Sequence, residues 1–175
     1  MGAGRSPTWM LAMRFEGPVK VLVVDDHAGI RNGIASLINA EWPRMCSAGA
    51  AATAGEALTL ARERQPDVVV LDVNLAGDDG LALIPVLQRL APCEIVVLTS
   101  LSDPHVAAHA RRLGAHACLN KTAPAIELVA CVFAAHHSRN AADPLNAGGV
   151  VSQRAGSKHP SALGRTDDAS HGTAA

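Results

Sequence analysis

Aromatic residues are scarce in this chain of 175 residues, where they make up 2% of the sequence and tyrosine is absent. Proteins that hold single-stranded nucleic acid often stack its bases on aromatic side chains, and this composition argues against such a platform. Neither sign of charge is in excess, because 15 Lys and Arg stand against 16 Asp and Glu, which leaves a net charge of −1. The composition therefore gives no electrostatic reason to expect nucleic acid or a membrane surface as a partner.

Long apolar runs and paired cysteines are also missing. The apolar patch at residues 9–13 is too short for a membrane helix or for the core of a signal peptide. The cysteines form no C-x-x-C pair and no zinc-binding spacing, and they are Cys46, Cys93, Cys118 and Cys131. Three of them lie in apolar sequence, where a reduced thiol packs as a small hydrophobe. These features predict a protein of the reducing cytoplasm.

Apolar runs typical of buried strands alternate with helical spacing along the interior of the chain. The strand-like runs are residues 19–24, 45–51, 67–72, 94–99 and 115–119. Thr53 and Glu56 form a capping box, Ser102-Asp103-Pro104 begins a helix, and Gly114 ends one. The alternation predicts an α/β fold, a doubly wound five-stranded parallel sheet with helices on both faces. Ligands of such sheets bind beyond the C-terminal ends of the strands.

The two ends of the chain differ from this interior. Beyond residue 137, Ala, Gly, Ser, Asp and His dominate, and such a segment buries too little apolar surface to offset its ordering entropy. We therefore expect a loosely ordered leader at 1–17, a folded domain at 18–137 and a disordered tail at 138–175. Met1, Met10 and Met13 all remain candidates for the true start.

Polar side chains follow four of the five predicted strands, and they are Asp25, Asp26, Asp72, Asn74, Thr99 and Lys121. Each alone has an ordinary explanation as a helix cap, a turn residue, a β-branched strand residue or a solvated lysine. Together they would place three carboxylates at one sheet edge, where they repel each other unless a divalent cation such as Mg2+ is bound. A hydroxyl and an ammonium add donors for phosphoryl oxygens, so the set suits phosphoryl transfer to a carboxylate.

Four segments in this order resemble the motif set of response-regulator receiver domains of two-component systems. They are Val23-Val24-Asp25-Asp26-His27, Val70-Leu71-Asp72-Val73-Asn74-Leu75, Val97-Leu98-Thr99-Ser100 and Leu119-Asn120-Lys121. Asp79-Gly80-Leu81 and Gly114-Ala115 make the NarL/FixJ subtype the most similar, and the resemblance covers about residues 19–137. It implies the flavodoxin-like receiver fold and a role in phosphorelay signal transduction, with no enzymatic activity beyond self-phosphotransfer and autodephosphorylation.

The resemblance also implies a role for each site residue. Asp72 resembles the phosphoacceptor, Lys121 would pair with the acyl phosphate, and Thr99 would hydrogen-bond it. The implied partner is a sensor histidine kinase or a phosphotransfer protein, and the implied output is through protein-protein contacts. A homodimer that forms on phosphorylation is left open.

The cofactor implied by the resemblance is Mg2+. Asp26 and Asp72 would hold the ion through their carboxylates and Asn74 through its backbone carbonyl, while Asp25 would act through a metal-bound water.

Two positions depart from the family. Cys118 stands where the family usually has an aromatic residue that moves with the threonine, which puts the usual switching output in question. Ala76 stands where a proline is common, which predicts a looser loop after Asp72.

Several alternatives stay open. The polar tail shows no recognition-helix pattern, so direct DNA binding is not expected, and the chain is either a stand-alone receiver or a truncated NarL/FixJ-type transcriptional regulator. A non-phosphorylated receiver-fold adaptor is a further alternative, favoured by Cys118 and disfavoured by the intact site residues. A haloacid-dehalogenase-like phosphatase would need D-x-D where Asp25 and Asp26 are adjacent. A flavin-binding protein would need a hydroxyl- and glycine-rich loop there.

Overall fold

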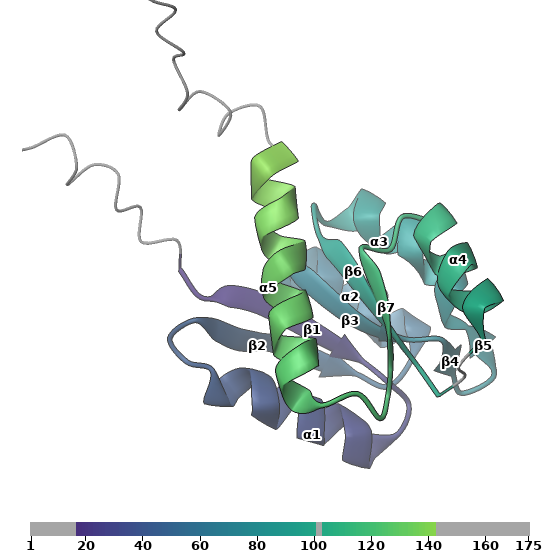
Figure 1. Cartoon of the computed structure of the whole chain (residues 1–175), viewed down its shortest axis with the longest axis horizontal. Coiled ribbons are helices and arrows are strands. Elements are labelled where there is room, and N and C mark those ends of the chain that lie inside the picture. The colour runs from purple at the N-terminus through teal and green to yellow at the C-terminus, as the bar shows by residue number, and fades with distance from the viewer. Residues whose placement is uncertain (1–16, 101–102, 143–175) are drawn as a thin grey trace, which may run out of the picture.

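A five-stranded sheet forms the centre of the structure, a computed structural model that describes residues 17–100 and 103–142 (Figure 1). Its strands are β1 (Val19–Val24), β2 (Met45–Ala51), β3 (Val68–Asp72), β6 (Glu94–Thr99) and β7 (Ala117–Asn120). They lie in the order β2-β1-β3-β6-β7, and every neighbouring pair is parallel. The predicted doubly wound parallel sheet is confirmed.

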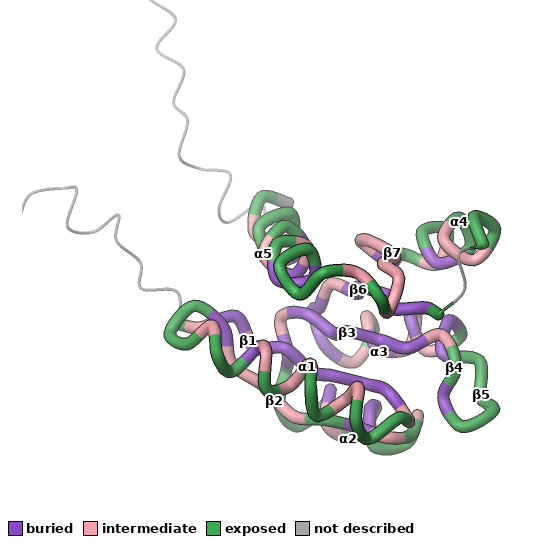
Figure 2. The backbone as a smooth tube through the Cα atoms, turned by 60° about the horizontal axis from the view of Figure 1, so that its bottom comes forward, coloured by how far each residue is buried: buried purple, intermediate pink, exposed green. Residues whose placement is uncertain are grey.

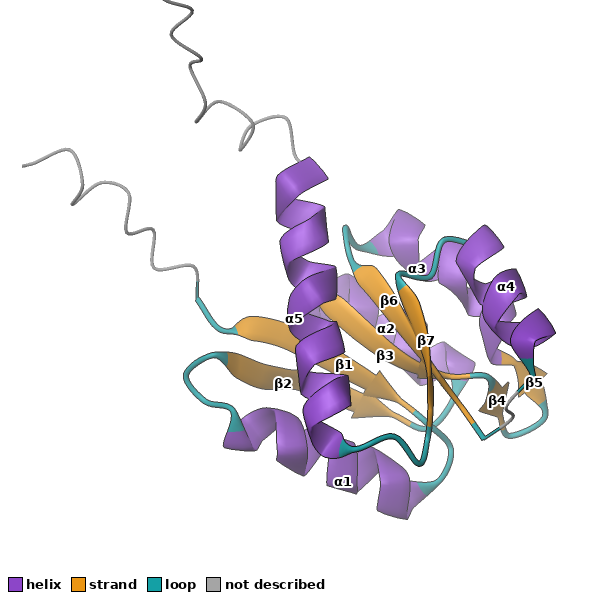
Figure 3. Ribbon diagram, viewed as in Figure 1, coloured by secondary structure: helices purple, strands orange, loops and turns teal. Residues whose placement is uncertain are grey.

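Helices cover both faces of the sheet (Figure 3). The elements on one face are α1 (Ala28–Ala40) and α5 (Ala125–Ala142), and those on the other are α2 (Ala54–Arg64), α3 (Ile84–Leu90) and α4 (Pro104–Arg112). Each face has its own apolar cluster, and β3 between them is buried at all its residues (Figure 2). That burial explains why β3 is an unbroken apolar run in sequence rather than an alternating one.

Local signals mark the start of α2 and both ends of α4. Thr53 Oγ1 accepts a hydrogen bond from the Glu56 N–H at 3.2 Å, and the Glu56 carboxylate accepts one from the Ala52 N–H at 2.7 Å. Asp103 caps α4 by accepting from the His105 N–H at 2.8 Å. Gly114 follows α4 with φ of 104°, in the left-handed region that favours glycine. The predicted capping box, cap and stop are therefore confirmed.

The segment after β3 contains short elements of regular secondary structure. Two short antiparallel strands, β4 (Asn74–Leu75) and β5 (Asp78–Asp79), form a hairpin, and the 3-10 helix η2 (Gly80–Leu83) follows. Both residues of the turn have positive φ, 51° at Ala76 and 96° at Gly77. Positive φ at both central positions is typical of the type I′ turn of a two-residue hairpin.

Helix α5 runs past the domain boundary expected at residue 137. It continues to Ala142, so residues 138–142 are helical. Arg139 explains part of the extension, because its Nη1 lies 3.2 Å from Asp67 Oδ1 and ties this last stretch of α5 to the start of β3. The leader at 1–16, the three candidate start residues and the rest of the tail lie outside the described residues. None of the helices within 17–100 and 103–142 is long and apolar enough to cross a membrane.

Candidate functional site

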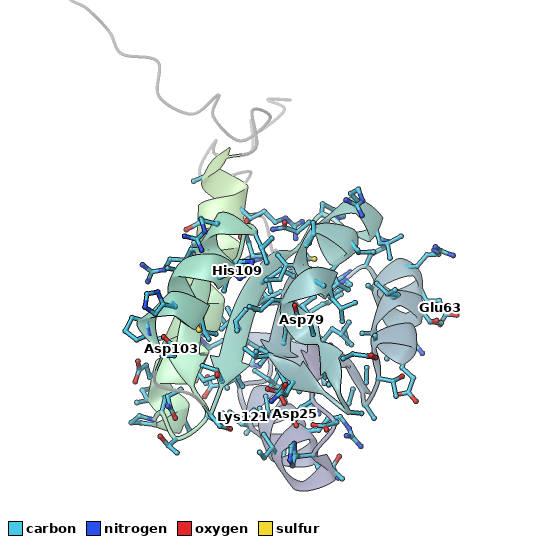
Figure 4. The ribbon with its side chains drawn as sticks, turned by 90° about the vertical axis from the view of Figure 1, so that its right-hand side faces the viewer. Asp25, Glu63, Asp79, Asp103, His109 and Lys121 are labelled. Atoms are coloured by element: carbon cyan, nitrogen blue, oxygen red, sulfur yellow. The ribbon has the colours of Figure 1, made fainter. Side chains whose placement is uncertain are left out.

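The C-terminal ends of the central strands bring the predicted polar residues together. Asp25 directly follows β1, Asp72 ends β3 and Thr99 ends β6. Lys121 follows β7, and its N–H donates to the Thr99 carbonyl at 2.8 Å, which fixes these two residues side by side. Figure 4 shows Lys121 and Asp25 next to each other at this edge, away from Glu63 and His109.

Lys121 is the cation at the centre of the site. Its Nζ donates to Asp72 Oδ2 at 2.5 Å and lies 2.7 Å from Asp25 Oδ2. The three side chains are 8%, 4% and 2% exposed for Lys121, Asp72 and Asp25, so water screens these charges little. Burial tends to lower the pKa of Lys121, but the two carboxylates outweigh it and raise that pKa above its ordinary value. The ammonium is therefore charged, and the triad carries a net negative charge.

Asp26 lies at the rim of the same site. Its Oδ2 accepts a hydrogen bond from the Ala76 N–H at 3.0 Å, which joins the hairpin after β3 to the end of β1. Partial burial tends to raise the pKa of Asp26, but the Ala76 N–H and the neighbouring His27 outweigh it and hold that pKa below 3.8. A proline at position 76 could not adopt the positive φ of Ala76, and it would have no N–H to donate to Asp26. The expectation of a looser loop at Ala76 stays a prediction.

His27 contributes a further polar side chain, which the sequence analysis did not assign to the site. Its Nδ1 lies 2.7 Å from Asp26 Oδ1 and 3.3 Å from Asp25 Oδ1. Its position directly after Asp25 and Asp26 could have indicated a place in the site. A residue at that position can equally well begin a helix. His27 is the N-cap of α1, but its side chain makes no capping hydrogen bond within the described part of the chain.

Arg31 holds the backbone of the acid pair. Its Nη1 donates to the carbonyl oxygen of Asp25 at 2.7 Å and lies 3.2 Å from that of Asp26. One guanidinium on the second turn of α1 thus fixes the turn from which both carboxylates project. The apolar spacing of α1 gives no reason to single out this residue.

The donor set fits a hard divalent cation. Asp25, Asp26, His27 and Asp72 each offer one ligand atom, and these atoms lie within 4.8 Å of one another. Asp25 Oδ2 and Asp26 Oδ1 are buried and make no aligned hydrogen bond to any described residue, although Lys121 Nζ and His27 Nδ1 lie close to them. Three carboxylates against one ammonium leave an excess of negative charge, and such oxygens are the ligands that Mg2+ prefers. Asn74 lies beside Asp72 and donates its N–H to Asp72 Oδ1 at 3.2 Å.

A cavity of about 110 Å³ opens between these residues. Asp72, Thr99, Lys121, Ser100 and His27 are among the residues that line it. Thr99 is itself buried, at 6% exposed, so its side chain belongs to the wall of the cavity rather than to the surface. The cavity has room for a group of a few heavy atoms beside the Asp72 carboxylate, since one water takes roughly 30 Å³ in the liquid.

Residues 21–133 match the family described as the response regulator receiver domain. The transcriptional regulatory protein LiaR of Bacillus subtilis is 32% identical over 136 residues, which cover 77% of this chain and 64% of LiaR. The chain thus spans somewhat less than two thirds of that relative.

Solved structures agree with this match. The signal receiver domain of NarL from Mycobacterium tuberculosis has a TM-score of 0.65 and 25% identity, over 69% of this chain and 98% of that one. A Burkholderia pseudomallei response regulator, solved with a phosphorylated aspartic acid, a calcium ion and citrate, has a TM-score of 0.61 and 28% identity, over 72% of this chain and 73% of that one. The chain therefore belongs to the response regulator receiver domains and is a protein of two-component phosphorelay signalling.

Proposed function

We propose that Asp72 accepts a phosphoryl group from a histidine kinase or a phosphotransfer protein of the cytoplasm, with Mg2+ bound beside it. The observation that carries the proposal is the position of the Asp72 carboxylate, which is buried, contacts Lys121 and faces the cavity bounded by Thr99. A buried carboxylate at a cavity, with donors around it, is suited to act as a nucleophile toward phosphorus.

The transfer forms one bond and breaks another. A carboxylate oxygen of Asp72 bonds to phosphorus as the bond between phosphorus and the donor's histidine nitrogen breaks, and the leaving imidazole takes up a proton. Lys121 Nζ, 2.5 Å from Asp72 Oδ2, lies where it can neutralise charge on the phosphoryl oxygens, and the Thr99 hydroxyl at the cavity wall can donate to one of them.

Asp25, Asp26, Asp72 and the Asn74 backbone carbonyl are the groups that would hold Mg2+. The ion supplies charge neutralisation for the transferring group. The phosphorylated aspartic acid and calcium ion of the Burkholderia pseudomallei structure support both assignments by analogy.

Replacing the acceptor tests the proposal. Incubation of the full chain with acetyl phosphate and Mg2+ should add one phosphoryl group, measured by intact-protein mass spectrometry. Asp72→Asn should abolish the addition, because an amide does not act as the nucleophile. Asp79→Asn is the matched control, since Asp79 is an exposed aspartate in the adjacent hairpin and should leave the addition unchanged. Addition that persists in Asp72→Asn would refute the assignment.

A second prediction concerns Cys118. A cavity of about 230 Å³ lies between Thr99, Cys118 and the start of α4, where the family usually places an aromatic ring. Burial raises the pKa of the Cys118 thiol, although Arg111 opposes the rise, so the side chain there is a small neutral group. Cysteine cannot fill this space when Thr99 moves toward a phosphoryl group. The response of α4, β7 and α5 to phosphorylation should therefore be small.

Cys118→Tyr should enlarge that response, at little packing cost because the cavity is already open. The measurement is the set of amide NMR shifts induced by beryllofluoride, a phosphoryl mimic, compared between the two proteins. Cys131→Val, on the opposite side of the sheet, is the control. Large shifts on α4, β7 and α5 in the native protein, unchanged in Cys118→Tyr, would show that this position does not limit the response.

A further inference from the structure

The imidazole of His27 faces the carboxylates of the site rather than the helix that it precedes. Its Nδ1 lies 2.7 Å from Asp26 Oδ1 and 3.3 Å from Asp25 Oδ1, although 64% of the side chain is exposed. Two buried carboxylate atoms of the same cluster, Asp25 Oδ2 and Asp26 Oδ1, lack an aligned hydrogen bond to any described residue. The imidazole nitrogen therefore lies among carboxylate oxygens, of which Asp26 Oδ1 contacts His27 itself and Asp25 Oδ2 contacts the Lys121 ammonium.

His27 is not needed elsewhere in the fold. The turn before α1 is closed by Asp25, whose Oδ1 accepts the His27 N–H at 2.8 Å, and by Arg31, which binds the carbonyls of the acid pair. The backbone of His27 therefore stabilises the turn, while its side chain contacts only the carboxylates of Asp25 and Asp26 among the contacts described. A side chain with that freedom can approach an ion without distorting α1.

The spacing of the four donor atoms suits a single ion. Opposite ligands of an octahedral site lie about 4.2 Å apart when each is about 2.1 Å from the metal. The ligand atoms of Asp25, Asp26, His27 and Asp72 all lie within 4.8 Å of one another, so a small contraction brings them to that geometry.

We infer that His27 is a nitrogen ligand of the metal site and that it shifts the preference of the site from Mg2+ toward borderline divalent cations such as Mn2+ and Co2+. Mg2+ selects oxygen ligands, whereas imidazole binds these transition metals well. The inference rests on the proposed function, because it concerns the same metal site, and it adds a residue and a metal preference to it.

Pulsed electron paramagnetic resonance of the full chain with Mn2+ alone tests the ligand directly. The protein is prepared without a polyhistidine tag and with 15N in its histidines only. A directly bound His27 gives a nitrogen modulation at the 15N frequency, which separates it from unlabelled backbone nitrogen. His27→Gln should remove this modulation, and His105→Gln, an exposed histidine on α4, should keep it.

Calorimetric titration supplies the second readout. His27→Gln should weaken Co2+ binding by about tenfold, and it should change Mg2+ binding by less than about threefold. Mn2+ binding without 15N modulation, or an equal loss of Co2+ and Mg2+ affinity, would overturn the ligand role and leave the proposed function intact. If neither Mn2+ nor Mg2+ binds the native chain, the proposed metal site itself is wrong, and the inference about His27 is refuted as well.

Discussion

Replacing Lys121 with methionine is expected to lower the free energy of unfolding by about 3–5 kcal/mol when divalent metal is absent. The substitution leaves the Asp25 and Asp72 side chains, 2% and 4% exposed, facing each other without the ammonium that contacts both. Methionine keeps most of the length and the apolar stem of lysine, so the loss reports the charge rather than a cavity. Urea unfolding in EDTA measures it.

Added Mg2+ should recover much of this loss, because an ion bound only by the folded state stabilises it by mass action. Lys20→Met is the matched control, since the Lys20 ammonium makes an exposed contact of 3.3 Å with the Arg64 carbonyl, and it should change stability by less than about 0.5 kcal/mol. A loss at Lys121 no greater than that at Lys20, or no recovery with Mg2+, would contradict the assigned electrostatics.

The pH dependence of the Lys121 contribution has a definite sign. Because the folded-state pKa of Lys121 is raised above its ordinary 10.5, its contribution is fully present below that pH. It is lost as the pH rises through the folded-state value. The difference between native and Lys121→Met proteins should therefore be constant near neutral pH and shrink only in strong alkali.

Gly80→Ala is expected to destabilise the domain by about 3 kcal/mol and to reduce phosphoryl addition at Asp72 at least tenfold. A Cβ on Gly80 would lie 2.0 Å from the Asp72 carbonyl oxygen and 2.8 Å from that of Val73. Both are backbone atoms, so the clash can be relieved only if the end of β3 moves. That movement would carry the Asp72 carboxylate away from Lys121.

Gly33→Ala is the control for Gly80→Ala. A Cβ at Gly33, inside α1, meets nothing within 4 Å, and alanine should stabilise the helix by up to about 1 kcal/mol. Thermal unfolding and intact-protein mass spectrometry measure both variants. A Gly80→Ala protein that is as stable as the native one and accepts phosphoryl as fast would show that the close approach of this glycine does not position Asp72.

The strands and most of the site could be predicted because their signals are local or follow from topology. The apolar run of β3 and the Thr53 cap of α2 are patterns over a few residues. Asp25, Asp72, Thr99 and Lys121 could be grouped because parallel strands place their C-terminal ends at one edge, so order along the chain predicts closeness in space.

Other features could not be predicted because they depend on contacts between distant segments. The positive φ of Ala76 is accompanied by a hydrogen bond to Asp26, which lies 50 positions earlier in the sequence. The last stretch of α5 depends on the pairing of Arg139 with Asp67, 72 positions apart. The orientation of the His27 ring toward the acid pair likewise depends on its side-chain conformation, which the periodicity of the sequence does not predict.

The position of the phosphoryl group tests the central claim most directly. The full chain is incubated with acetyl phosphate and Mg2+ and then treated with borohydride, which reduces an aspartyl phosphate to homoserine. Peptide mass spectrometry locates the altered residue. The expected result is homoserine at position 72 and at no other aspartate. Homoserine at Asp25, Asp26 or Asp79 with position 72 unaltered would contradict the claim, as would a phosphoryl group found on His27.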